Sequence, residues 1–310
     1  MAIIREEKVI YLILQFGYPT EAYSQPIEHI AAYELAANEL GITVLKVDVG
    51  RISRYSFYFP DYQRNDEVAN HIGEALVYAA NLISGPMADL QESNSEYAIP
   101  YEVVKESRKV DLQILINVEE MRGLEFKELN FPTLTLGSAS FLDDHDMAAS
   151  WKITPHIHKN MDFFNAARYF KESQDSFFVY PGQYDDLIYD SESYFKSGWE
   201  QNQQESALLN SFKAIEGLVG VFPSRDHKLI NKIQNLGIDP NLEFGLSPKL
   251  PLYLFLRQME KARNQSSAHG KKTSKEILVR DLFLYQGCAR FILMLVLQHK
   301  LKDNILPRYL

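Results

Sequence analysis

An arginine, an asparagine and a histidine lie within one short polar segment, Arg263-Asn264-Gln265-Ser266-Ser267-Ala268-His269-Gly270, between two apolar patterns with helical spacing. Arginine is a permanently charged, planar group that binds phosphate oxygens in pairs. Histidine gives and takes protons near neutral pH. These are the two side chains that metal-free cleavage of a phosphodiester requires. Arg263, Asn264 and His269 are therefore candidate catalytic residues.

The distribution of charge favours a phosphate-binding role for the same part of the chain. The whole sequence has a net charge of −9, which argues against nucleic-acid binding. Residues 249–310, however, hold 12 Lys or Arg and 4 Asp or Glu, a balance of +8, and residues 1–248 carry −17. A basic part on an acidic body is expected where that part meets phosphate, although it is equally expected if the basic residues solvate two helices or face an acidic partner. The lysines that flank the segment are predicted to follow an RNA backbone: Lys261, Lys271, Lys272 and Lys275.

The first half of the chain mixes strand and helix patterns, which predicts an α/β or α+β module over residues 1–152. Helices are expected at Pro26–Leu40 and Asp66–Ile83, where proline and glycine mark the ends. Short runs rich in apolar residues predict five strands: Lys8–Phe16, Ile42–Val49, Ser53–Phe59, Leu112–Val118 and Pro132–Leu136. The strand Ser53–Phe59 is expected to pair with Ile42–Val49 across Gly50-Arg51.

Residues 153–310 predict an all-α bundle. Thr154-Pro155 is a favourable helix start, with threonine as N-cap and proline at the first helical position, and this helix is expected to reach Val179. Thr273-Ser274-Lys275-Glu276 has the spacing of a capping box, so the last helix is expected from Thr273 to about Lys300. The helices expected between them are Asn202–Phe222, Asp226–Leu236 and Leu250–Arg263.

Two segments of this bundle resemble the HEPN domain family. One is Ala207-Leu208-Leu209-Asn210-Ser211-Phe212-Lys213-Ala214-Ile215-Glu216-Gly217-Leu218, which is similar to a bundle helix that ends in an apolar-Glu-x-Leu pattern. The other is Arg263-Asn264 to His269-Gly270, followed by a long apolar helix; five residues separate its arginine and histidine, against four in the commonest form of the family. The resemblance covers residues 153–303. It implies a helical bundle, and many bundles of this family are ribonucleases that act as homodimers.

The resemblance also implies a mechanism. The 2′-hydroxyl of a single-stranded or looped RNA would attack the adjacent phosphorus and leave a 2′,3′-cyclic phosphate and a 5′-hydroxyl. His269 would be the general base or acid, and Arg263 would bind the scissile phosphate. Asn264 would orient either group, and Glu216 would hold Arg263 in place. No metal ion or cofactor is expected.

The resemblance further implies roles for the rest of the protein. The N-terminal module would sense a signal, choose substrates or hold the nuclease inactive, and an inhibitory or activating protein partner is expected. Nucleases of this family often serve in toxin–antitoxin or anti-phage defence systems.

Other functions remain open from the sequence. One alternative is a catalytically inactive bundle that serves as a dimerisation or nucleotide/RNA-binding platform, and another is an active site in the N-terminal module. Arg263 and His269 would then cap helix ends or pair with acidic neighbours. Metal-capable side chains occur at Asp143-Asp144-His145-Asp146, which resembles a solvated loop, and at His156 and His158, which a helix would point to different faces.

The remaining features indicate a cytoplasmic protein without a membrane segment. The start of the chain has no signal-peptide pattern, and the most apolar run, Phe291–Leu297, is too short to cross a bilayer. Cys288 is the only cysteine, so no disulfide within the chain is possible. Its place in an apolar helical pattern predicts a core residue.

Overall fold

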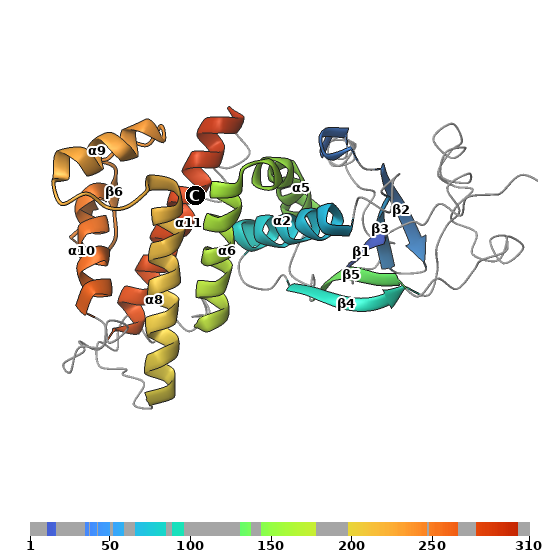
Figure 1. Ribbon diagram of the computed structural model, residues 1–310, viewed down its shortest axis with the longest axis horizontal. Helices are drawn as coiled ribbons and strands as arrows, with labels where there is room; N and C mark the ends of the chain where they lie inside the picture. The colour runs from blue at the N-terminus through green and yellow to red at the C-terminus, as the bar shows by residue number, and fades with distance from the viewer. Residues whose placement is uncertain are drawn as a thin grey trace, which may run out of the picture. The chain divides into compact units, whose positions relative to one another are not determined.

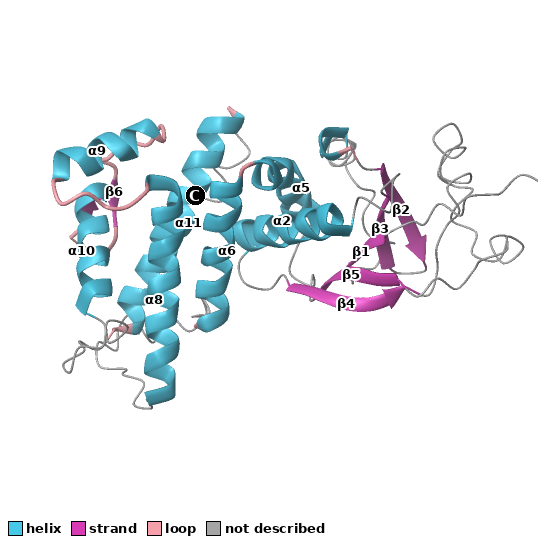
Figure 2. Cartoon of the chain, viewed as in Figure 1, coloured by secondary structure: helices cyan, strands magenta, loops and turns pink. Residues whose placement is uncertain are grey.

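The structure is a computed structural model, and most of the residues it describes are helical (Figures 1 and 2). The chain divides into two compact units, Met1–His158 and Lys159–Leu310. The structure describes residues 11–16, 35–36, 38–41, 43–49, 52–58, 66–84, 89–95, 131–137, 144–177, 198–246, 248–265 and 277–302.

The first unit contains a five-stranded sheet with the order β2-β3-β1-β5-β4. Strand β1 pairs in parallel with β5 and antiparallel with β3, and the pairs β2–β3 and β4–β5 are antiparallel. The pairing of β2 with β3 is the one predicted across Gly50-Arg51. Strand β4 was not predicted, because its sequence DLQESNS has one apolar residue and no strand periodicity. The strands are β1 Tyr11–Phe16, β2 Thr43–Val49, β3 Ile52–Tyr58, β4 Asp89–Ser95 and β5 Phe131–Gly137.

Helices α2 (Asp66–Ser84) and α5 (Asp144–Lys159) belong to the same unit. Helix α2 packs on β4 and β5 and buries an apolar face from Ile72 to Ile83. The predicted strand Leu112–Val118 lies outside the described residues, as does most of the predicted helix Pro26–Leu40, of which residues 35–36 and 38–40 are helical.

The predicted helix start at Thr154-Pro155 is wrong, because Pro155 lies inside α5. The Thr154 hydroxyl donates to the carbonyl of Ser150 over 2.7 Å, as a threonine within a helix does. The break comes later, at Asn160, whose side-chain oxygen accepts from the backbone N–H of Phe163 over 3.1 Å. Asn160 is therefore the N-cap of α6 (Met161–Ser176), and the first helix of the predicted bundle begins at Met161.

The second unit is a helical bundle in which α6 packs most extensively on α8 (Gly198–Val219) (Figure 1). Small residues make this contact close. A Cβ atom added to Gly217 of α8 would lie 3.3 Å from the Cβ of Ala166 in α6, so a side chain there would force the helices apart. The buried Ser173 hydroxyl lies 2.6 Å from that of Ser211 and donates to the carbonyl of Ala207.

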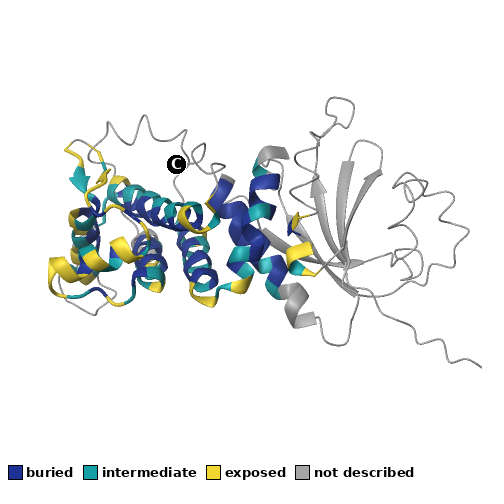
Figure 3. Cartoon of the chain, turned by 90° about the horizontal axis from the view of Figure 1, so that it is seen from above, coloured by how far each residue is buried: buried dark blue, intermediate teal, exposed yellow. Residues whose placement is uncertain are grey.

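Helix α11 (Val279–Leu301) completes the core of the bundle, with buried residues that recur along its length from Val279 to Leu297. Figure 3 shows the buried residues of the described helices in dark blue. Gln286 donates from its Nε2 to the carbonyl of Phe177 over 2.7 Å and to the carbonyl and hydroxyl of Ser173. This side-chain amide thereby satisfies carbonyls at the C-terminal end of α6. Cys288 is fully buried, as predicted, and burial raises the pKa of its thiol well above the usual range.

Three shorter elements complete the second unit. Helix α8 ends at Val219, and the next residue, Gly220, has a φ of +74° and donates to the carbonyl of Glu216, so the helix stops three residues before the predicted end at Phe222. A turn leads to α9 (Asp226–Asn235), and the small hairpin of β6 (Glu243–Phe244) and β7 (Leu250–Pro251) leads to α10 (Leu252–Gln265).

Two expectations about α11 are corrected. The helix begins at Val279 after Leu278, which provides no side-chain cap, rather than at the capping-box pattern, and residues 271–276 lie outside the described part. Among the described helices, α11 is also long and apolar enough to cross a membrane, which the short run Phe291–Leu297 did not suggest. Of its most apolar window, 56% is buried inside the bundle, which is typical of the core helix of a soluble protein.

Candidate functional site

Arg263 is placed by a buried stripe along α10. Leu252, Leu256 and Met259 are fully buried, and they follow one another at spacings of four and three residues. Arg263 comes four residues after Met259, so it continues the same helix face towards α8. Its side chain is 22% exposed. The stripe that fixes the bundle therefore also fixes the position of the arginine.

The guanidinium of Arg263 lies over an aromatic ring and next to two polar groups. Its Cζ is 4.4 Å from the centre of the Phe212 ring, a cation–π contact with a fully buried aromatic residue of α8. Its Nε and Nη2 donate to Oδ1 of Asn264 over 3.3 and 3.1 Å. Its Nη1 lies 3.4 Å from Oε2 of Glu216, which is long for a hydrogen bond. The two segments singled out in the sequence thus meet in space, and the Asn264 amide oxygen orients Arg263.

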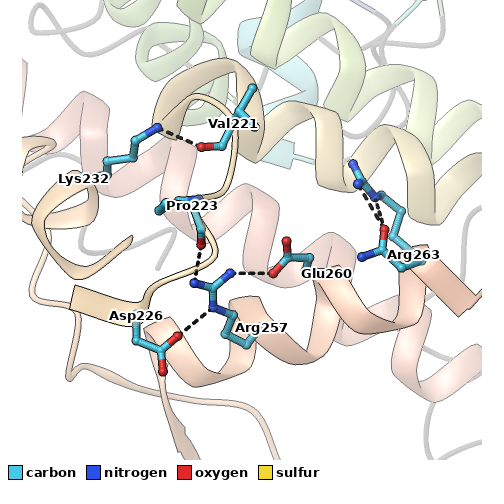
Figure 4. Close-up of polar contacts among 8 residues, drawn as sticks. Val221, Pro223, Asp226, Lys232, Arg257, Glu260 and Arg263 are labelled. Atoms are coloured by element: carbon cyan, nitrogen blue, oxygen red, sulfur yellow. Dashed lines mark hydrogen bonds and ion pairs between the residues drawn. The ribbon is translucent and has the colours of Figure 1, made fainter. Parts of the chain in front are cut away.

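Arg257, on the same helix, is held by three short contacts (Figure 4). Its Nε donates to Asp226 over 2.9 Å, its Nη1 to Glu260 over 2.7 Å and its Nη2 to the carbonyl of Pro223 over 2.5 Å. These contacts join α10 to the start of α9 and to the turn after α8. Arg257 is therefore a structural arginine. Arg263 differs in its partners, because it donates to the neutral amide of Asn264 over 3.1 and 3.3 Å and lies 3.4 Å from the carboxylate of Glu216.

Glu216 carries an unfavourable charge at this position. Burial raises the pKa of its carboxyl group above the usual value, and the neighbouring Glu260 raises it further. Arg263 and Lys213 act in the opposite direction and lower it, but they do not cancel the effect of burial. A carboxylate that is partly desolvated and next to a cation is a common feature of functional sites.

Replacing Glu216 by glutamine is expected to leave the bundle as stable as the wild type, or more stable, at pH 7. A carboxyl group whose pKa is raised on folding contributes stability below its ordinary pKa, and that contribution is lost as the pH rises through the folded value. Glutamine does not ionise, so the stability of the variant does not fall as the pH rises. The variant is therefore expected to be the more stable protein between pH 5 and 8, and the difference in stability should shrink towards pH 4. Thermal unfolding across this range, with the exposed Glu172→Gln as control, measures the difference. A Glu216→Gln protein that is less stable at pH 7 would show that attraction to Arg263 outweighs burial.

Lys213 is a residue of this surface that the sequence analysis did not single out. It lies three residues before Glu216 on α8, within reach of its carboxylate, and its Nζ is 5.1 Å from the ring centre of Tyr169 in α6. The Cζ of Arg168 is also 5.1 Å from that ring. The spacing of Lys213 and Glu216 was the available signal, because residues three apart share a helix face.

One other predicted site residue in the described ranges, Lys261, is not brought to Arg263. Lys261 precedes it by two positions, roughly 200° around the helix, so it points to the other side of α10. There it is exposed and lines a separate pocket. His269, Lys271, Lys272 and Lys275 lie outside the described residues.

The metal-capable residues of the sequence lie elsewhere. Asp144 and Asp146 are in the first turn of α5, so this stretch is helical and not the predicted loop. His156 and His158 are near the end of α5 instead of at a helix start, and Nδ1 of His158 lies 2.7 Å from Nδ1 of His71 in α2. Within the described ranges, no group of three or more histidine, cysteine or acidic residues is arranged to hold a metal ion.

The arrangement around Arg263 can bind an anion. It offers a planar cation on a buried aromatic ring, an amide that orients it, a carboxylate at 3.4 Å and a second cation one turn away. Comparison of the chain with protein-family models, with curated proteins and with solved structures gives no match.

Proposed function

We propose that this protein is a metal-independent endoribonuclease of the HEPN type. The observation that carries the proposal is the position of Arg263. The arginine lies over the buried Phe212 ring, next to Glu216 and hydrogen-bonded to Asn264. A guanidinium held in this way can bind phosphate oxygens with its planar fork while the ring and the neighbouring groups keep its orientation.

Each residue then has a role in strand cleavage. Arg263 binds the non-bridging oxygens of the scissile phosphate and stabilises the charge that develops on them. His269 removes the proton of the 2′-hydroxyl or protonates the leaving 5′-oxygen. The 2′-oxygen forms a bond to phosphorus as the bond to the 5′-oxygen breaks, which yields a 2′,3′-cyclic phosphate and a 5′-hydroxyl. Glu216 and Asn264 position Arg263, and Lys213 adds a cation near the same carboxylate.

The proposal extends to the assembly and its control. A homodimer would place two copies of the segment 263–270 in one cleft. Residues 1–152 would form an α+β sensor or substrate-selecting module, with residues 153–310 as the nuclease bundle. An activating or inhibitory partner and a role in toxin–antitoxin or anti-phage defence follow the same family analogy. The protein would act in the cytoplasm.

Substituting His269 by alanine is expected to abolish RNA cleavage by the purified protein in EDTA, because no other proton-transfer group is proposed at the site. Wild-type and variant proteins are incubated with single-stranded RNA, and the ends of the products are identified. Cleavage by the wild type alone, with cyclic-phosphate ends, supports the proposal. Equal cleavage by both proteins contradicts it, and cleavage by neither favours the alternative of an RNA-binding or dimerisation platform.

A further inference from the structure

A second site lies on the other side of α10 from Arg263, in a surface pocket of about 250 Å³. Helix α10 contributes Gln258, Lys261, Ala262 and Gln265, which share one helix face because their spacings are three and four residues. Ile277, Asp281 and Tyr285 line the opposite wall, the last two one turn apart on α11. The pocket thus joins the end of one helix to the beginning of the next.

The lining combines flat apolar surface with hydrogen-bonding groups of each kind. Ala262, Ile277 and the ring of Tyr285 offer apolar contact, and the ring is held from behind by Phe255, with centroids 5.9 Å apart. Lys261 only donates hydrogen bonds, the glutamine amides donate and accept, and the ionised Asp281 only accepts. Burial and the nearby Asp281 raise the pKa of Tyr285 to about 12, so its hydroxyl keeps its proton at neutral pH. A pocket that combines apolar surface with donors and acceptors can bind a planar, polar heterocycle.

The hydrogen-bonding character of Asp281 favours one kind of heterocycle over another. Its side chain is 37% exposed, and its Oδ1 lies 3.6 Å from the Nε of Arg280, which is too long for a strong hydrogen bond. An acceptor-only group pairs best with two adjacent N–H donors. Guanine presents these at N1 and at its exocyclic amine, with acceptors at O6 and N7 for lysine or amide donors. Adenine presents one donor beside an acceptor at the corresponding edge, so it would leave one carboxylate oxygen facing a lone pair.

We propose that this pocket binds a guanine base, with Asp281 accepting from the N–H donors of the base and Lys261 or a glutamine amide donating to its acceptors. The base comes either from a free guanine nucleotide or from a single-stranded RNA. This site does not rest on the proposed cleavage activity. Arg263 is on the opposite face of α10, so base binding and strand cleavage are separable properties.

The test is isothermal titration calorimetry of the full-length chain with GMP, AMP and a short oligouridylate that contains one guanosine. Asp281→Asn replaces one carboxylate oxygen by an amide donor of the same shape. It is expected to weaken guanine binding roughly 10- to 100-fold, the usual effect of losing a charge-assisted hydrogen bond.

Ala262→Leu fills the pocket from α10 and should weaken binding of any base. Glu172→Gln, at a side chain of α6 that is 45% exposed, is the matched control for loss of one charge.

Each outcome bears on the proposal. Binding of GMP at least tenfold tighter than that of AMP, and lost in Asp281→Asn but not in Glu172→Gln, supports a free-nucleotide site. The same pattern with the guanosine-containing RNA alone supports a base of the RNA strand. Equal affinity for GMP and AMP, an unchanged Asp281→Asn, or no saturable binding of either guanine ligand up to about 1 mM overturns the proposal. GMP and AMP contain no internucleotide bond, so the free-nucleotide outcomes do not depend on whether the wild type cleaves RNA.

Discussion

Replacing Arg263 with lysine is expected to lower the rate of RNA cleavage by roughly 100- to 1,000-fold while the protein stays folded. The substitution keeps the positive charge but removes the planar fork that contacts two phosphate oxygens at once. The loss of one oriented donor to the charge that develops in a transition state costs a factor of this size in other enzymes. The ammonium group would also lie differently on the Phe212 ring and beside Glu216. Single-turnover cleavage of RNA in EDTA measures the effect.

Arg257→Lys is the matched control for this prediction. It makes the same chemical change on the same helix, at an arginine whose donors are occupied by Asp226, Glu260 and the Pro223 carbonyl (Figure 4). We expect it to lower the thermal stability and to leave cleavage within about threefold of the wild type when assayed well below its unfolding temperature. Equal loss of activity in both variants would assign the effect of Arg263→Lys to the fold and remove Arg263 from the site.

Truncating Phe212 to alanine is expected to reduce the free energy of unfolding by about 3 to 5 kcal/mol. The ring is fully buried, lies 4.7 Å from the ring of Phe222 and supports the Arg263 guanidinium. Its removal leaves a cavity where α8 meets α10, and dense packing allows only partial collapse. Chemical denaturation, followed by circular dichroism at 222 nm, gives the change. A cost below about 1 kcal/mol would contradict the packing described for this residue.

Phe212→Leu separates the two functions of that ring. Leucine keeps most of the apolar volume, so we expect a cost below about 1.5 kcal/mol. It removes the aromatic face, however, and with it a cation–π contact of about 0.5 to 2 kcal/mol with Arg263. Cleavage should therefore fall several-fold in a protein that remains well folded. Cleavage at the wild-type rate would show that Arg263 is positioned by Asn264 and Glu216 alone.

The sequence predicted the helices of the second unit well where a buried apolar stripe defined them. The predicted helix Asp226–Leu236 agrees with α9 to one residue, and α8 and α10 differ from their predictions by two to four residues at their ends. The start of α6 was wrong because Thr154-Pro155 has the composition of a helix N-terminus. The tertiary structure instead continues α5 through the proline and uses Asn160 as the cap. Local propensity is a weak guide where packing of the flanking turns favours another boundary.

The candidate site was only partly predictable. The approach of Glu216 to Arg263 was expected from the family resemblance, and the structure places the two side chains 3.4 Å apart. Phe212 belongs to the segment that carries the family resemblance and is fully buried, but a helix pattern does not show that a cation lies over its ring. Lys261 and Arg263 are near neighbours in sequence and were grouped together, yet helical geometry separates them to different faces of α10. The pocket between α10 and α11 depends on how two helices pack, which no local pattern encodes.

Because Cys288 is buried, chemical labelling of its thiol can report when the bundle opens. The chain has a single thiol, and it is fully enclosed by the bundle and kept in its unreactive, protonated form. A thiol-specific reagent can therefore modify it only when the helices around α11 separate. Each molecule gains one label, so intact mass measured over time gives the frequency of that opening directly. The labelling rate, measured with and without RNA or guanine nucleotides, would show how much each ligand stabilises the folded bundle against opening. The measurement requires no dye and no engineered residue.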